Sequence, residues 1–271
     1  MITKPEIDKL VQTYETVDFI KDDPIQIPHQ FKEKKDIEIS GFIASLVAYG
    51  RRELFIKKLD LLLEIAQNEP LNFIENFEPK IIGDFNYRFG KPEDFSAIFS
   101  ILKDLYTKDG GLEELFKYGH SQGKLFETVT DYFYSKADKN LGQGFYFMIP
   151  NPRKGGAMKR MCMYLRWLVR KGPVDFGVWN FMKPSELYIP LDVHVGRISR
   201  EMGLLSRKAN DFKSVIEITN NLKQFDPIDP IKYDFAMFGY GVNQGKQEWQ
   251  GLISYYKFIY IITSYKYGNT S

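Results

Sequence analysis

The chain has 271 residues, with 37 lysines and arginines against 35 aspartates and glutamates, three histidines and one cysteine. The single cysteine, Cys162, excludes an internal disulfide framework, an iron–sulfur cluster held by four cysteines and a cysteine-based zinc site. The N-terminus lacks an apolar signal region, and Lys257 interrupts the longest apolar run near the C-terminus. We therefore expect a cytoplasmic protein without a membrane segment, folded as one domain over residues 1–271.

Apolar residues recur at helical spacing in the first half of the chain. The pattern predicts one helix over residues 36–50 and a second over residues 53–66 that stops before Pro70. Similar patterns cover residues 95–106, 112–118 and 125–134. Because strand-like alternations are few and short, we predict an all-α fold. The tail over residues 252–267 fits a strand by propensity and a helix by spacing, and both interpretations stay open.

The charge is unevenly distributed along the chain. Residues 139–174 carry eight positive charges and no acidic residue, whereas the other 235 residues carry a net charge of −6. Within this basic segment, residues 151–156 have the composition of a turn and residues 157–171 have helical spacing. One face of that helix is apolar and is predicted to be buried; it comprises Met158, Cys162, Leu165, Leu168 and Val169. Lys159, Arg166 and Arg170 fall in a narrow arc on the opposite side.

This basic helix has two interpretations. The simpler one is a solvated helix face. The functional one is an anion site, because a glycine turn leads directly into the helix, whose first-turn N–H groups can bind a phosphate. On that interpretation the expected phosphate contacts are Arg153, Lys154, Arg160, Arg166 and Arg170.

A second segment of interest follows the basic helix. Asp192 stands where a helix N-cap belongs, after Pro190, and Gly203 can end the helix that follows. Asp192 could simply cap that helix, which is worth about 1 kcal/mol. His194 could be a packing or hydrogen-bonding residue. The other two histidines, His29 and His120, are distant in sequence, so we expect no multi-histidine metal centre.

The run of residues 191–198, Leu-Asp-Val-His-Val-Gly-Arg-Ile, resembles the Asp-Thr-His-Val-x-Arg segment of the helix-hairpin-helix (HhH-GPD) DNA glycosylases. In that superfamily the aspartate is the catalytic carboxylate, and a catalytic lysine lies upstream, just after a glycine hairpin. The spacing from Lys159 to Asp192 is similar to that of the archaeal 8-oxoguanine glycosylases. More widely, the chain resembles a bacterial family without an assigned function, and that resemblance covers most of residues 36–245. It rests on residues 159–160, 165–167, 174–179, 190–192 and 226–241. The chain departs from the superfamily in lacking a Leu-Pro-Gly-Val-Gly hairpin and in having Val193 in place of threonine.

The resemblance implies two helical lobes around a cleft on which Lys159 and Asp192 converge, with a variant of the helix-hairpin-helix. It implies a monomeric DNA glycosylase that excises a damaged purine such as 8-oxoguanine, with or without lyase activity, and that needs no cofactor, metal or iron–sulfur cluster. Lys159 would be the nucleophile, with Lys154 as a rival. Such an enzyme holds an extruded base between aromatic side chains, for which the candidates are Phe145, Phe147, Trp167, Phe176 and Trp179.

Two other functions remain open. A non-catalytic nucleic-acid-binding protein could keep the same scaffold and bind DNA with salt-dependent affinity. A metal-dependent phosphohydrolase could use Asp192 and His194, although the sequence shows no further metal ligands. A DNA-binding form would be associated with the nucleoid.

Overall fold

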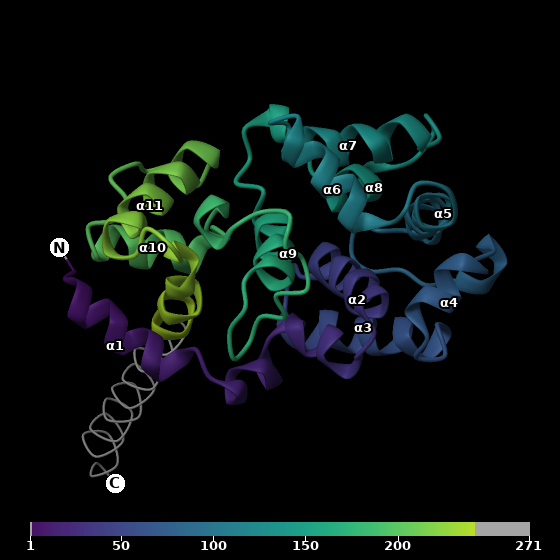
Figure 1. The fold of residues 1–271 in the computed structure, drawn as a ribbon. Coiled ribbons are helices and arrows are strands. Elements are labelled where there is room, and N and C mark those ends of the chain that lie inside the picture. Colours follow the sequence, from purple (N-terminus) through teal and green to yellow (C-terminus); the bar gives the residue numbers. More distant parts are fainter. Residues whose placement is uncertain (1, 242–271) are drawn as a thin grey trace, which may run out of the picture.

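Figure 1 shows the chain as a computed structural model, which describes residues 2–241. The described residues form helices and no strand; three isolated β-bridges are the only strand-like pairings among them. The α-helices are α1 (Lys4–Tyr14), α2 (Lys34–Val47), α3 (Arg52–Ile65), α4 (Pro70–Glu75), α5 (Pro92–Lys108), α6 (Leu112–Ser121), α7 (Leu125–Lys136), α8 (Gln143–Met148), α9 (Lys159–Val169), α10 (Val193–Glu201) and α11 (Phe212–Phe225), and residues 233–241 are also helical. Short 3₁₀ turns lie at Val17–Asp22, Pro24–Gln26, Pro28–Gln30, Pro79–Ile82, Pro152–Lys154, Pro184–Glu186 and Pro230–Lys232.

The predicted helical character of the described chain is confirmed. Each of the five helical patterns in the first half of the sequence corresponds to one of the helices α2, α3, α5, α6 and α7, with ends displaced by a few residues. Prolines mark several starts, because the missing N–H of a proline is not needed in the first turn; Pro70 and Pro92 open α4 and α5 in this way. The undecided tail over residues 252–267 lies outside the described residues.

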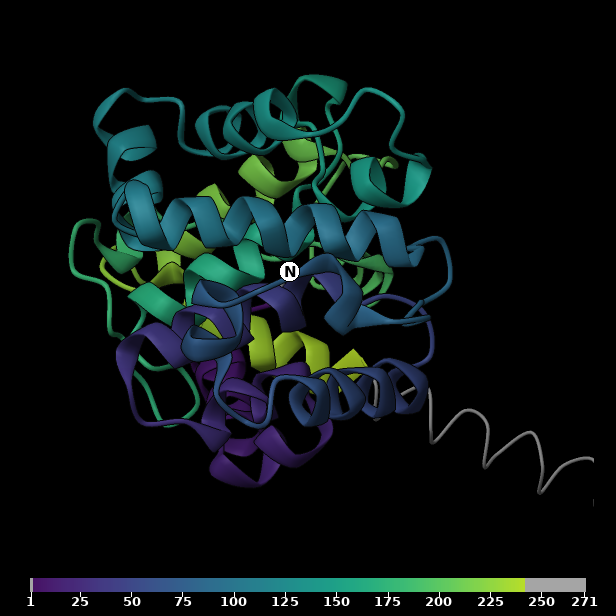
Figure 2. The same cartoon turned by 90° about the vertical axis from the view of Figure 1, so that its right-hand side faces the viewer.

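Helix α9 lies at the centre of the molecule. In Figure 1, helices α2 to α8 are on one side of α9, and α1, α10 and α11 are on the other. Figure 2 views the first of these groups face on, with the long helix α5 running across it. No helix among residues 2–241 is long and apolar enough to cross a membrane.

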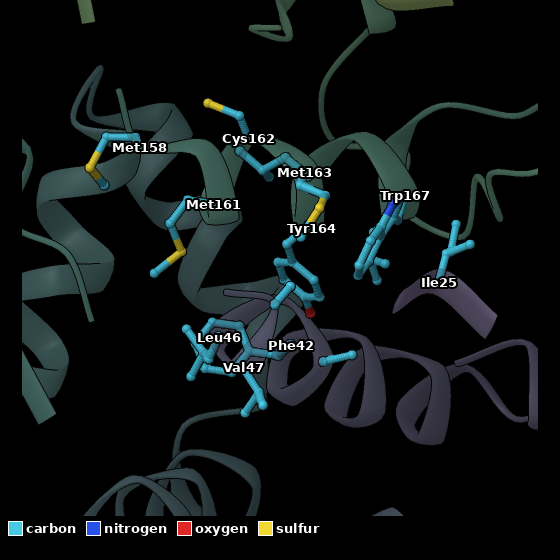
Figure 3. Packing of buried hydrophobic residues seen from close by; sticks show 14 of the residues in the cluster. Ile25, Phe42, Leu46, Val47, Met158, Met161, Cys162, Met163, Tyr164 and Trp167 are labelled. Carbon is cyan, nitrogen blue, oxygen red and sulfur yellow. The ribbon is translucent and has the colours of Figure 1, made fainter. Parts of the chain in front are cut away.

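The contact between α9 and α2 forms a large part of the core. Tyr164 of α9 packs edge-on against Phe42 of α2 (Figure 3), with 5.3 Å between ring centroids. The Tyr164 hydroxyl donates a hydrogen bond to the carbonyl of Glu38 (3.1 Å). All residues from Met161 to Val169 are buried. The apolar face predicted for this helix is therefore correct, but the exposed basic arc predicted on its opposite side is wrong, because Arg166 is buried as well.

Candidate active site

The start of α9 is set by a tight turn. The side chain of Asn151 accepts a hydrogen bond from the Arg153 N–H (2.9 Å), and Gly155 has a φ of +73°, a left-handed conformation that favours glycine. The carbonyl of Gly155 accepts a hydrogen bond from the Phe212 N–H at the start of α11 (3.0 Å), which anchors the turn. Lys159 is consequently held as the first residue of α9.

Asp192 precedes α10 and caps it, as predicted. Its Oδ1 accepts a hydrogen bond from the Val195 N–H (2.9 Å), which satisfies one of the unpaired donors at the start of the helix. Its other oxygen, Oδ2, lies 3.2 Å from the Nζ of Lys159. The side chain of Asp192 is 15% exposed and that of Lys159 is 35% exposed, so the pair is accessible to a ligand without lying on the open surface. The predicted convergence of Lys159 and Asp192 is confirmed.

The pair lies in a cleft with a volume of about 770 Å³. Volumes of roughly 300–1,000 Å³ are typical of small-molecule sites. Its walls combine charged and aromatic side chains from both sides of α9; besides the pair they include Asp23, Tyr49, Arg52, Arg166, Trp167, His194, Asp234, Phe235 and Phe238. The cleft can therefore hold a planar group close to an amine and a carboxylate.

Two further carboxyl groups of the cleft were not predicted. Burial raises the pKa of Asp23, whose Oδ1 accepts a hydrogen bond from the Ile25 N–H (3.0 Å). Burial also raises the pKa of Asp234 to about 6; Arg166 opposes that shift, and the negative charge of Asp192 adds to it. Asp234 lies in the segment on which the family resemblance rests, but Asp23 follows a part of the chain without any motif. Asp23, Asp192 and Asp234 therefore line the same cleft.

The prediction that Arg166 and Arg170 contact phosphates is wrong. Arg166 lies between Asp175 (3.2 Å) and Asp234 (2.5 Å), and its guanidinium stacks on the ring of Phe235. Arg170 pairs with Asp175 (2.8 Å) and also with Glu15 and Asp229. Both arginines are buried, and their charges neutralise the nearby Asp175 and three carboxylates from distant parts of the chain.

The other predicted phosphate contacts have different environments. Arg153 is exposed and pairs with Asp131 of α7 (2.7 Å), while Lys154 is exposed on the same turn. Arg160 donates to the carbonyls of Leu46 (3.0 Å) and Phe147. Burial lowers its pKa to about 10, so it is still charged at neutral pH. These three residues remain candidates for contacts with an anionic partner.

The predicted base pocket is only partly assembled. Trp167 lines the cleft. Trp179 is buried elsewhere, where its Nε1–H donates to Glu38 (2.9 Å), and Phe176 packs on the ring of His29, 4.3 Å away. Neither Phe176 nor Trp179 borders the cleft, because the loop after α9 packs these two side chains against α2 and against His29. The other aromatic walls come from Tyr49, Phe55, Phe235 and Phe238, none of which was predicted as a pocket residue.

His194 borders the cleft next to Asp192, with its ring edge-on to Phe238 (6.2 Å between centroids). Within residues 2–241, no group of three or more histidine, cysteine, aspartate or glutamate side chains is arranged to hold a metal ion.

The predicted position of Cys162 on the buried face of α9 is confirmed, and burial raises the pKa of its thiol.

The family assignment follows from the sequence of residues 23–243, which matches the family described as protein of unknown function (DUF2400). The chain belongs to the DUF2400 family. All residues that line the cleft lie within the matched span, whereas α1 lies outside it. No curated protein and no solved structure matches this DUF2400 chain.

Proposed function

We propose that this DUF2400 protein is a DNA N-glycosylase with lyase activity, which excises a damaged purine such as 8-oxoguanine. The observation that supports this proposal most directly is the approach of Lys159 Nζ to Asp192 Oδ2, 3.2 Å apart at the starts of α9 and α10 and inside one cleft. The helices on the two sides of α9 would correspond to the two lobes of a glycosylase, and the turn before Lys159 to a variant of its hairpin.

The chemistry of such a reaction suits an amine next to a carboxylate. Cleavage of an N-glycosidic bond develops positive charge on the sugar, which the carboxylate of Asp192 would stabilise. The Nζ of Lys159 would form a bond to C1′ while the bond from C1′ to the base breaks, and the electron pair would leave with the base. The proton released from Nζ would pass to Asp192, which already contacts it. The nitrogen lone pair would then form a C1′=N bond while the C1′–O4′ bond breaks, and the proton held by Asp192 would pass to O4′. The protonated imine formed in this way would permit strand scission.

The test uses labelled duplexes that contain 8-oxoguanine, other damaged purines or only normal bases, incubated with the protein in the presence of borohydride. We expect base release and a covalent adduct with at least one damaged duplex. Lys159→Gln should abolish the adduct. Lys154→Gln is the matched control, because Lys154 is the rival nucleophile on the turn that precedes α9. The adduct should still form in this variant, with at most a lower yield from the loss of a phosphate contact.

Two results would contradict the proposal. The first is the absence of base release and of an adduct with every duplex. The second is an adduct that survives in Lys159→Gln, which would remove the residue on which the mechanism depends. Salt-dependent DNA binding that persists in Asp192→Asn, without turnover on any duplex, would instead assign the cleft to a non-catalytic nucleic-acid-binding protein.

A further inference from the structure

Three aromatic side chains from separate parts of the chain meet next to the cleft. Phe147 lies edge-on to both Tyr49 (4.8 Å between centroids) and Phe89 (5.1 Å), and the rings of Tyr49 and Phe89 are nearly parallel, with 9° between their planes. Phe89 is 54% exposed and Phe147 is 40% exposed. Because Tyr49 also lines the cleft, this aromatic cluster continues the cleft wall onto the surface. A gathering of exposed apolar rings commonly marks an interaction site.

Phe89 is held at the tip of a tight turn. The backbones of Tyr87 and Gly90 exchange two hydrogen bonds of 2.9 Å across it, and Arg88 adopts a φ of +50°, which is unusual for a residue other than glycine. The Tyr49 hydroxyl donates to the carbonyl of Tyr87 (3.0 Å), and the Tyr87 hydroxyl donates to the carbonyl of Tyr49. These bonds join the turn firmly to the end of α2, so the ring of Phe89 is presented outward in a fixed position.

A glycine at position 50 permits this arrangement. Gly50 has a φ of +84°, and a Cβ atom there would lie 2.3 Å from a guanidinium nitrogen of Arg88. The positive φ favours glycine at this position, and a side chain there would have to displace the end of the Arg88 side chain. The strained residue and the close approach both serve to place an exposed phenylalanine at the rim of the cleft.

Arginines accompany the aromatic rings. The guanidinium carbon of Arg88 is 5.6 Å from the ring centroid of Phe89, and that of Arg160 is 4.7 Å from the ring centroid of Phe147. Arg51 and Arg52 follow Gly50 directly, and Arg52 lines the cleft. Aromatic faces combined with arginines are the composition of surfaces that stack single-stranded bases and neutralise the adjoining phosphates.

We propose that the aromatic cluster of Tyr49, Phe89 and Phe147 binds an unstacked nucleobase of the DNA strand, next to the nucleotide that occupies the cleft. The inference rests on the proposed nucleic-acid substrate but not on catalysis. The arginines over the rings favour a planar, anionic partner over a second copy of this chain, whose matching surface would bring the same positive charges together.

The experiment uses a duplex that no glycosylase can cleave, with a tetrahydrofuran abasic analogue and 2-aminopurine as the neighbouring base. Binding is followed by the anisotropy of a distant label, and base stacking is followed by the 2-aminopurine fluorescence. We expect Phe89→Ala to weaken DNA binding at least about fivefold and to remove most of the change in 2-aminopurine fluorescence that wild-type binding causes. Phe89→Tyr should retain both, because tyrosine offers the same ring face.

The matched control is Tyr118→Ala, which removes an aromatic side chain that is 60% exposed on α6 and does not line the cleft. It should leave both signals unchanged, and thermal unfolding should confirm that all variants fold. Wild-type binding that Phe89→Ala does not alter would overturn this inference and leave the glycosylase proposal intact. Phe89-dependent binding by a protein that releases no base would support the inference and overturn the glycosylase.

Two further outcomes would also overturn the inference. If the wild-type protein binds no DNA, the cluster has another partner. If sedimentation shows a dimer that Phe89→Ala dissociates while DNA affinity is unchanged, the cluster is an interface between two copies of this chain.

Discussion

Asp192 performs two separate tasks, and two substitutions can distinguish them. Its Oδ1 caps α10 through the Val195 N–H, and its Oδ2 contacts the amine of Lys159. Asparagine retains an oxygen for the cap but has no charge for the sugar or the amine. Alanine removes both functions. We therefore expect Asp192→Asn and Asp192→Ala to be equally inactive but unequally stable.

The expected stability changes follow from the contacts. Loss of a capping side chain costs about 0.5–2 kcal/mol. The ion pair with Lys159 is partly exposed and contributes at most about 1 kcal/mol, and the interaction of the carboxylate with the start of α10 contributes about 0.3–1 kcal/mol. Asp192→Asn should lower the free energy of unfolding by about 0.3–2 kcal/mol, and Asp192→Ala should lower it by about 0.5–2 kcal/mol more through the lost cap. For a chain of this length, each kcal/mol corresponds to about 2–4 °C in Tm.

The assay combines urea unfolding of both variants with borohydride trapping on the damaged duplex that the wild-type protein cleaves. Removal of a group that stabilises the charge of a transition state typically reduces the rate by about 10²–10³-fold. We expect a loss of at least this size in both variants. Asp192→Asn with wild-type turnover would refute a catalytic role for the carboxylate, and equal destabilisation by the two substitutions would refute the capping role.

Three other predictions concern charges elsewhere in the structure. Arg170→Met should lower the free energy of unfolding by about 3–5 kcal/mol, because it removes the partner of the buried Glu15 carboxylate and one of the two partners of Asp175. Arg153→Met breaks an exposed pair and should cost at most about 1 kcal/mol. Similar losses for the two variants in urea unfolding would contradict the buried network. Burial raises the pKa of Asp234 in the folded state to about 6 from its ordinary value of 3.8, so the folded state binds this proton more tightly than the unfolded state does. The contribution of Asp234 to the free energy of unfolding should therefore fall by up to about 3 kcal/mol as pH rises from about 4 to 6. In urea unfolding at several pH values, the stability of Asp234→Asn should fall less over this range than that of the wild type, and identical pH profiles would argue against the raised pKa. Arg88→Gly should preserve the turn, because glycine tolerates a φ of +50°. DNA binding should weaken, and the slope of log Kd against log salt concentration should fall by about one. An unchanged slope would show that Arg88 does not contact the DNA.

The sequence by itself determined the features that depend on neighbouring residues. Helical periodicity located α2, α3 and α9, because a buried stripe must recur every three to four residues. The cap at Asp192 was also predictable, because Asp192 and Val195, whose N–H donates to its side chain, are only three residues apart in the sequence. The glycine turn before Lys159 also followed from local composition. These features place Lys159 and Asp192 at the starts of two helices, whereas the prediction that the two residues face one cleft came from the resemblance to the helix-hairpin-helix glycosylases.

The tertiary structure alone decided which charges and aromatic rings reach that cleft. Arg166 and Arg170 resemble a surface arc on the helix, but the carboxylates that bury them come from Glu15, Asp175, Asp229 and Asp234, up to 155 residues away. Periodicity describes one helix and carries no information about which distant acids pack against it. Likewise, Asp23 and Phe89 reach the site through turns whose positions depend on packing against α2. Arg166 and Arg170 are buried, whereas Arg153 is exposed, because of ion pairs with remote residues that the local sequence pattern does not contain.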